Sequence, residues 1–261
     1  AAMSYETIRY AVQDGVATIT LNRPEVLNAI NRTMLAEIRA AVAALQEDAA
    51  VRVAVLDSAS PRAFSAGIDV AMVKDMPPLG SREMGRLLHD TFGAIRFAKK
   101  PVIAAIDGLC LGAGLELAVS CDLMIATDRS RFGLPNINVG IPAIVEAAIL
   151  PQAIGIMGAR EMCYTGEFWD AAKAERRGLL NAVVPPERFR EEVRAWAQRV
   201  ASKSPLALET QKEIINQWMT APLEAAIEHS INTVVINWLT RDQKEGMGAF
   251  LEKRPARFTG E

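Results

Sequence analysis

A segment near the middle of the chain places a carboxylate beside backbone amide groups that are free to donate. Residues 112–118 read GAGLELA and follow an apolar, β-branched stretch over residues 101–106, which predicts a strand, a tight glycine turn and a helix. The first N–H groups of a helix have no intrahelical acceptor and carry partial positive charge. Ala113 can therefore donate to a developing oxyanion, and Glu116 lies three residues on, on the same helical face. This pair can move protons next to a polarised carbonyl group.

A second segment of small residues predicts a second donor. Residues 63–69 read AFSAGID and follow a strand expected over residues 53–56. Small residues at Ala66 and Gly67 let a ligand approach the main chain closely. The N–H of Ala66 would then be the partner of the Ala113 N–H, and the two donors would hold one carbonyl oxygen between them.

The two motifs, at this separation, resemble those of the enoyl-CoA hydratase/isomerase (crotonase) superfamily. The resemblance covers nearly the whole chain, and further matching segments are residues 19–24, 27–29, 101–108, 121–122, 246–247 and 250–254. It implies an α/β fold built as a spiral of β-β-α repeats, followed by helices that form a homotrimer or a homohexamer made of two trimers. It also implies an acyl-CoA thioester as substrate, with its carbonyl oxygen between the N–H groups of Ala66 and Ala113.

The rest of the chain alternates between expected strands and helices, which by itself favours an α/β fold. We expect a hairpin over residues 7–10 and 16–21, strands over 53–56, 102–106 and 123–126, helices over 31–46 and 82–97, and a mobile loop over 74–81. From residue 206 onward the pattern is helical, with Pro205 and Pro222 at helix starts. Together with this pattern, the resemblance implies a core over residues 1–200 that holds the acyl-CoA site and a helical oligomerisation region over 201–261. Ala1 and Ala2, ahead of Met3, are interpreted as a cloning remnant.

Composition agrees with such an enzyme without identifying it. The chain has 261 residues, is 50% hydrophobic and carries a formal net charge of -2, which gives no electrostatic argument for a nucleic-acid partner or a membrane surface. The three cysteines, Cys110, Cys121 and Cys163, have no metal-like spacing and cannot all pair, which favours a reducing compartment, by default the cytoplasm. The only histidines, His89 and His229, are isolated, so we expect no metal and no cofactor other than the coenzyme A of the substrate.

The resemblance implies an enoyl-CoA hydratase that adds water, syn, across the 2,3-double bond of the thioester. Glu116 would deprotonate water for attack on the β-carbon while the oxyanion hole stabilises the enolate. Hydration also needs a proton at the α-carbon, and typical family members supply it from a second glutamate in a segment resembling residues 132–136. Here that position is Asn136, whose amide can orient water or substrate but cannot act as a general acid near neutral pH.

This departure leaves several alternatives open. An enoyl-CoA isomerase or an acyl-CoA hydrolase could use the same scaffold, and a non-catalytic acyl-CoA- or RNA-binding protein is a further alternative. If the chain is a hydratase, Glu116 alone could handle both protons through a bound water. Glu146 is the other candidate, inside an apolar stretch over residues 141–148 that predicts a helix. Burying an unpaired carboxylate costs several kcal/mol, so we expect Glu146 to face solvent, a partner group or the active site.

The resemblance assigns further motif residues to binding of the acyl-CoA. They are Glu25, Val26, Leu27, Ala29, Ser65, Gly67, Ile68, Asp69, Gly112, Phe250 and Lys253. No phosphate-cradling GxxxxGK loop occurs, so we expect scattered basic groups such as Arg23 and Lys253 to contact the phosphates of coenzyme A. An incomplete dinucleotide fingerprint over residues 112–117 and an incomplete nucleophile elbow over 63–67 argue against nicotinamide binding and serine hydrolysis.

Overall fold

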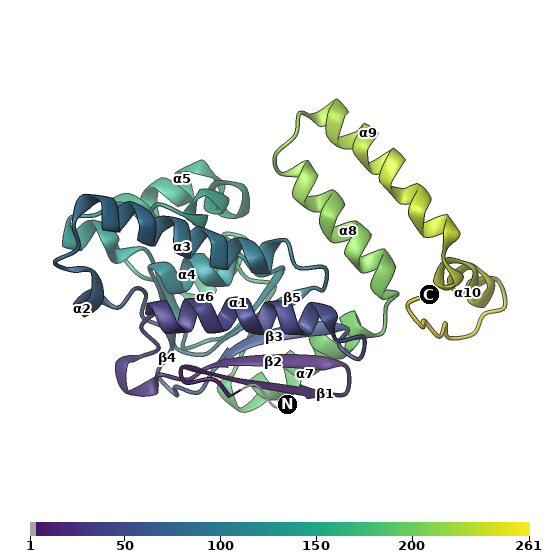
Figure 1. Ribbon diagram of the computed structural model, residues 1–261, viewed down its shortest axis with the longest axis horizontal. Coiled ribbons are helices and arrows are strands. Elements are labelled where there is room, and N and C mark those ends of the chain that lie inside the picture. The colour runs from purple at the N-terminus through teal and green to yellow at the C-terminus, as the bar shows by residue number, and fades with distance from the viewer. Residues whose placement is uncertain (1–3) are drawn as a thin grey trace.

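Two sheets organise the N-terminal part of the chain, as the ribbon diagram shows (Figure 1). The computed structural model describes residues 4–261, so the expected remnant, Ala1 and Ala2, lies outside the described residues. The larger sheet has the strand order β1-β2-β3-β5-β7-β10, and the smaller has the order β4-β6-β8-β9. The bounds of the strands are β1 (Ile8–Gln13), β2 (Val16–Leu21), β3 (Val53–Ser58), β4 (Ala63–Ser65), β5 (Val102–Ile106), β6 (Leu109–Leu111), β7 (Leu123–Thr127), β8 (Arg131–Gly133), β9 (Trp169–Asp170) and β10 (Ala182–Val184).

From β3 to β8, successive strands alternate between the two sheets, which produces the expected spiral of β-β-α repeats. β3 enters the larger sheet and β4 the smaller, and the same alternation recurs with β5 and β6 and again with β7 and β8. Each pair is followed by one or more helices. The helices are α1 (Arg32–Glu47), α2 (Val70–Val73), α3 (Pro78–Arg96), α4 (Ala113–Val119), α5 (Leu150–Thr165), α6 (Ala171–Arg176) and α7 (Phe189–Ala201). The fold expected from the resemblance is confirmed.

The period of two along β3 explains how the larger sheet is covered on both faces. Ala54 and Leu56 point into the main core, which includes the apolar face of α1. Val53 and Val55 point the other way, into a second cluster closed by Ala197 of α7. A parallel strand buried on both faces is expected to be apolar throughout, and β3 shows this pattern up to Asp57.

The C-terminal helices extend away from the core (Figure 1). They are α8 (Pro205–Trp218), α9 (Leu223–Thr233), the 3-10 helix η5 (Val234–Leu239) and α10 (Arg241–Leu251). Lys212 anchors α8, because its Nζ donates to Asp122 Oδ2 at 2.7 Å and to the carbonyl oxygens of Ile95 and Lys100 at 3.0 and 3.2 Å. The apolar side chains of Leu223, Trp238 and Leu239 remain largely exposed. The helical character expected from residue 206 onward is observed, and its role in oligomerisation stays a prediction.

Two local expectations do not hold. The helix expected over residues 141–148 is wrong, because residues 141–145 are irregular and a 3-10 helix, η3 (Glu146–Ile149), follows before α5 begins at Leu150. Pro142 disfavours helical backbone at the residue before it, and Val145 has a non-helical φ of -105° and ψ of -106°. The loop expected over residues 74–81 is shorter than predicted, because α3 already begins at Pro78. None of the helices described in residues 4–261 is long and apolar enough to cross a membrane.

Candidate active site

Glu116 is buried on α4, directly behind the glycine turn that begins the helix. Only 3% of the residue is exposed, and its Oε1 accepts a hydrogen bond from the N–H of Ala147 at 3.3 Å. Burial raises the pKa of Glu116 to about 7, and the charge of Glu146 adds to the rise, whereas backbone N–H groups of residues 144, 145 and 147 oppose it. At neutral pH the carboxyl group is therefore poised to accept or to donate a proton.

The segment AFSAGID lies against the start of α4, as a shared oxyanion site requires. Gly67 has a φ of +105°, and a Cβ there would lie 3.0 Å from the carbonyl oxygen of Leu111 and 3.5 Å from the nitrogen of Ala113. Only glycine fits this backbone comfortably. Ala113 is the first residue of α4, and its N–H has no acceptor within residues 4–261. One expected donor is thus free and close to Gly67.

The second expected donor is already engaged. The N–H of Ala66 donates to the carbonyl oxygen of Leu27 at 2.9 Å, and the N–H of Gly67 donates to Ser65 Oγ at 3.2 Å. The role predicted for the Ala66 N–H therefore does not fit the structure. The N–H of Ile68 has no acceptor in the described part of the chain, and it follows the residue that abuts Ala113. Ile68 N–H is the available second donor.

Ser65 holds the two motifs together instead of facing a ligand. It is fully buried, and its Oγ donates to the carbonyl oxygen of Asn28 at 2.8 Å. Gly114 approaches it so closely that a Cβ there would lie 2.6 Å from the Ser65 carbonyl oxygen. The binding role predicted for Ser65 is replaced by a positioning role for the segment that carries Gly67 and Ile68.

The loop before α1 packs on the same segment. Arg23 Nη1 donates to the carbonyl oxygen of Ala29 at 2.6 Å and to Asp69 Oδ2 at 3.1 Å. Arg23 is therefore paired with Asp69 and is not the free cation that the sequence suggests for a phosphate contact. The 3-10 helix η1 (Pro24–Val26) presents Glu25 and Val26 at the surface, whereas Leu27 and Ala29 are half-buried. Their predicted contacts with coenzyme A stay predictions.

Asn136 brings an unpaired amide oxygen to the glycine turn. It lies on the 3-10 helix η2 (Pro135–Val139), and its Oδ1 is buried without a hydrogen-bond partner among residues 4–261. A Cβ on Gly112 would lie 3.6 Å from this oxygen, so the amide faces the residue directly before Ala113. Because an unsatisfied buried polar atom costs about 1–3 kcal/mol, this one marks a place where a ligand or water is expected to bind.

Glu146 is buried, pairs with groups on α3 and lies close enough to Glu116 to affect its pKa. Its side chain is only 2% exposed, and Oε1 lies 2.7 Å from His89 Nδ1 and 3.8 Å from Arg96 Nη2, both on α3. Its Oε2 is buried and unpaired within the described residues. Burial raises the pKa of Glu146 while His89 and Arg96 act to lower it. His89, which the sequence marks as isolated, is thus a member of this cluster.

Phe250 and Lys253 are not brought to Glu116 in the same chain. Phe250 lies near the end of α10 and is 81% exposed, and Lys253 follows the helix with a φ of +56°. Figure 1 shows α10 beyond α8 and α9, on the opposite side of the molecule from α4. A contact of these residues with coenzyme A in the same chain's site does not fit this placement.

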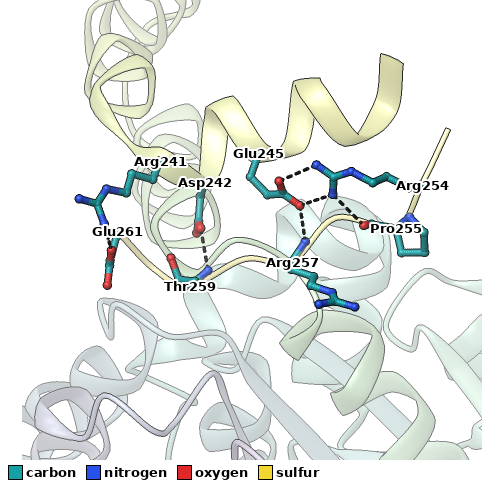
Figure 2. Close-up of a pocket in the computed structure, with 8 residues that line it drawn as sticks. All are labelled: Arg241, Asp242, Glu245, Arg254, Pro255, Arg257, Thr259 and Glu261. Carbon is teal, nitrogen blue, oxygen red and sulfur yellow. Dashed lines mark hydrogen bonds and ion pairs between the residues drawn. The ribbon is translucent and has the colours of Figure 1, made fainter. Parts of the chain in front are cut away.

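The C-terminal segment forms a separate cavity of about 640 Å³. Figure 2 shows its lining residues, Arg241, Asp242, Glu245, Arg254, Pro255, Arg257, Thr259 and Glu261. The charges pair with one another, for example Arg254 with Glu245 at 2.7 Å and Arg241 with Glu261 at 2.6 Å. Asp242 accepts from the N–H of Thr259 at 2.8 Å. These bonds fold the tail onto α10 and make no contact with the residues around Glu116.

The described residues contain no set of side chains suited to bind a metal ion. No group of three or more His, Cys, Asp or Glu side chains within residues 4–261 could hold a metal ion. Cys110, Cys121 and Cys163 are all free thiols, and burial raises the pKa of each. The site therefore combines the free main-chain amides of Ile68 and Ala113 with the carboxyl group of Glu116 and the unpaired amide oxygen of Asn136, which suits a substrate with a polarised carbonyl.

Comparison with known proteins agrees with this chemistry. The family model described as enoyl-CoA hydratase/isomerase matches residues 11–261. A crotonyl-CoA hydratase from Syntrophomonas wolfei is 38% identical over 98% of this chain and 99% of its own length. A short-chain-enoyl-CoA hydratase from Clostridium acetobutylicum is 34% identical over 92% of each chain. A solved structure of an enoyl-CoA hydratase subunit from Geobacillus kaustophilus superposes with a TM-score of 0.93 at 38% identity, over 98% of this chain and 99% of that one. The chain belongs to the enoyl-CoA hydratase/isomerase family.

Proposed function

We propose that the protein is an enoyl-CoA hydratase that adds water, syn, across the 2,3-double bond of an acyl-CoA thioester. The observation that carries the proposal is the position of Glu116, a buried carboxyl group with a pKa raised to about 7, on the helix whose first N–H is free. Relatives named for the hydration of crotonyl-CoA and short-chain enoyl-CoA support it at 38% and 34% identity.

In this mechanism the thioester oxygen binds between the N–H groups of Ile68 and Ala113. Electron withdrawal makes the β-carbon electrophilic, and the ionised Glu116 takes a proton from water as its oxygen attacks that carbon. Negative charge then grows on the thioester oxygen, where the two fixed donors stabilise it. Loss of one such donor typically costs about 3 kcal/mol, or a factor on the order of 100 to 1000 in rate.

Asn136 has a positioning role in the proposal. Its buried, unpaired Oδ1 lies beside Gly112 and can accept a hydrogen bond from the attacking water or from the substrate. It cannot deliver a proton, because an amide is not an acid near neutral pH. Hydration therefore needs its α-carbon proton from another group.

The family relationship leaves an isomerase as the second candidate. Asn136 favours it, because moving a double bond needs one shuttling carboxylate and no second acid at this position. A panel of 2-enoyl-CoA and 3-enoyl-CoA esters, analysed by mass spectrometry and chromatography, separates these functions. Gain of one water supports the hydratase, a shifted alkene of unchanged mass supports the isomerase, and release of free coenzyme A supports a hydrolase.

The test of Glu116 compares two variants that each replace one glutamate by glutamine. Glu116→Gln removes the base, and Glu83→Gln changes an exposed glutamate on α3. We expect Glu116→Gln to lower kcat by a factor on the order of 100 to 10,000 with nearly unchanged binding of a saturated acyl-CoA, whereas Glu83→Gln keeps full turnover. Unchanged turnover in Glu116→Gln would refute the assigned role.

We also propose an assembly and a compartment for the protein. The exposed apolar side chains of α9 and η5, such as Leu223, Trp238 and Leu239, support a homotrimer or a homohexamer built through this region. Sedimentation of the purified protein tests it. Three free thiols support a reducing compartment, by default the cytoplasm.

A further inference from the structure

A second carboxyl group, that of Glu146, lies on η3, the element that also binds Glu116, and the proposed mechanism gives it no role. Glu116 Oε1 accepts from the N–H of Ala147, and Ala147 directly follows Glu146 in η3. The two carboxyl groups are close enough for the charge of Glu146 to raise the pKa of Glu116. Neighbouring carboxyl groups in a buried site do not ionise together easily, so one of them retains a proton.

One oxygen of Glu146 is tied to α3, and the other is free. Oε1 lies 2.7 Å from His89 Nδ1, whereas Oε2 is buried without a partner in the part of the chain that the structure describes. The His89 side chain is 57% exposed. A chain of groups thus leads from solvent through the imidazole to Oε1 of a carboxyl group whose other oxygen, Oε2, is unpaired within the described residues.

An ion pair that merely fastens α3 to η3 is the simpler explanation. Arg96 favours it, because its Nη2 lies 3.8 Å from Glu146 Oε1. A purely structural pair, however, would use both carboxylate oxygens and the guanidinium fully, since burial of unpaired polar atoms is costly. Here both Glu146 Oε2 and Arg96 Nε are left unpaired within residues 4–261.

We infer that Glu146 is the second proton-transfer group of this site, and that His89 is a positioning residue that orients it and connects it with solvent. The inference rests on the hydration proposed above. Glu146 would supply the proton that Asn136 cannot provide. It lies on a different element, η3, but carries the carboxyl group that typical family members have at the position of Asn136.

The steps balance over one turnover. Ionised Glu116 takes a proton from water, the hydroxide oxygen bonds to the β-carbon, and the π electrons of the double bond move to form the enolate held by Ile68 and Ala113. Protonated Glu146 then donates its proton to the α-carbon, and the enolate electrons return to form the thioester carbonyl. Glu116 ends protonated and Glu146 ionised, so Glu116 releases a proton to solvent while Glu146 regains one through His89. The net change is addition of one water.

The groups that face this relay come from four elements. His89 and Arg96 lie on α3, Glu116 on α4 and Glu146 on η3, and the charge of Glu116 also acts on Cys163 of α5. The cationic or hydrogen-bonding partners on α3 favour the ionised form of Glu146, and burial favours the neutral form. Removing His89 should therefore make Glu146 a weaker acid.

The first test measures turnover of crotonyl-CoA by the purified protein. We expect Glu146→Gln to lower kcat by a factor on the order of 100 to 10,000, while the affinity for butyryl-CoA changes less than about threefold and the exposed control Glu83→Gln is unaffected. If Glu146→Gln retains wild-type turnover while Glu116→Gln loses it, the inference is wrong and the hydratase function stands. If the wild-type protein hydrates no 2-enoyl-CoA, the proposed function itself fails.

The second test separates positioning from structural support. The alkaline limb of the kcat profile reports loss of the proton from the acid. We expect His89→Gln to move this limb upward by about one pH unit, whereas His229→Gln, which changes the other histidine, leaves it in place. If His89→Gln lowers kcat but leaves the alkaline limb in place, His89 only supports the structure, and its assigned positioning role is wrong.

Discussion

The carboxyl group of Glu116 is held by the backbone of the turn that begins at Glu146, through the hydrogen bond from the N–H of Ala147 at 3.3 Å. This bond joins two elements separated by 31 residues in the chain. It holds the carboxyl group of Glu116 at a fixed position relative to η3, which also carries the acidic side chain of Glu146. The geometry of proton transfer therefore depends on η3 as much as on α4.

The pH dependence of activity follows from the state of Glu116. Its pKa is raised to about 7, and the base must be ionised to accept a proton from water. We expect kcat/KM for crotonyl-CoA to rise with pH through a midpoint near 7, the pKa of Glu116 in the free enzyme. A flat profile from pH 5 to pH 7 would contradict the assignment of Glu116 as the base, because the ionised fraction of this group rises across that range.

The same group should destabilise the folded protein at alkaline pH. Its pKa rises from 4.5 to about 7 on folding, so the folded state favours the protonated form. That contribution to stability is fully present below about pH 4.5 and is lost as the pH rises through about 7, a loss on the order of 3 kcal/mol. Glu116→Gln should therefore raise Tm relative to the wild type at pH 8 and have little effect near pH 4.5, as thermal melts can check. An equal change of Tm at both values of pH would show that the effect is not due to ionisation.

Gly67→Ala should separate the oxyanion hole from the rest of the fold. The added Cβ would lie 3.0 Å from the Leu111 carbonyl oxygen at a backbone φ of +105°, and relief would shift Ile68 relative to Ala113. We expect kcat/KM to fall by a factor on the order of 100 to 1000, with a loss of stability of about 1–3 kcal/mol. Gly93→Ala on α3 is the control, because a Cβ there meets nothing within 4 Å. Wild-type kinetics for Gly67→Ala would mean that these amides do not bind the thioester oxygen.

Asn136→Glu tests what the amide contributes. The substitution places a carboxyl group beside Gly112, where Asn136 Oδ1 is buried and unpaired. We expect it to raise hydration of crotonyl-CoA and to restore turnover to a Glu146→Gln background, because a proton donor would again be available to the α-carbon. Steady-state kinetics of both variants provides the measurement. A decrease or no change in the single variant would indicate a site built for a different reaction.

The sequence predicted the long elements because their patterns are strong. The apolar run of β3 and the hairpin formed by β1 and β2 both appear as expected. The smaller sheet could not be read in the same way, because β4, β6 and β8 have three residues each, too few to show a period. The apolar stretch over residues 141–148 shows the converse error, since it forms an irregular segment and a 3-10 helix in which Ile141 and Ile144 are exposed and only part of the stretch packs on the core.

The sequence predicted where the candidate site lies, but it could not predict the hydrogen bonds that its residues make. Glu116 and Ala113 follow from the motif, because a helix start leaves its first N–H free. The choice between Ala66 and Ile68 depends on the Leu27 carbonyl oxygen, which a distant loop brings to the Ala66 N–H. The pairing of Glu146 with His89 joins residues 57 positions apart, and no local pattern encodes such a contact.

Lys212→Met should weaken the attachment of α8 to the core. Lys212 Nζ is held by Asp122 Oδ2 at 2.7 Å and by two carbonyl oxygens, and its side chain is only 7% exposed. Breaking a buried pair by removing one partner typically costs about 3–5 kcal/mol, because the other charge stays buried. The double variant Lys212→Met/Asp122→Asn should recover part of this loss, and Lys99→Met, which changes an exposed lysine, should cost less than about 0.5 kcal/mol. Chemical denaturation monitors the free energy of unfolding, and sedimentation shows whether the assembly survives. A single variant as stable as the wild type would mean that apolar packing alone fixes α8 on the core.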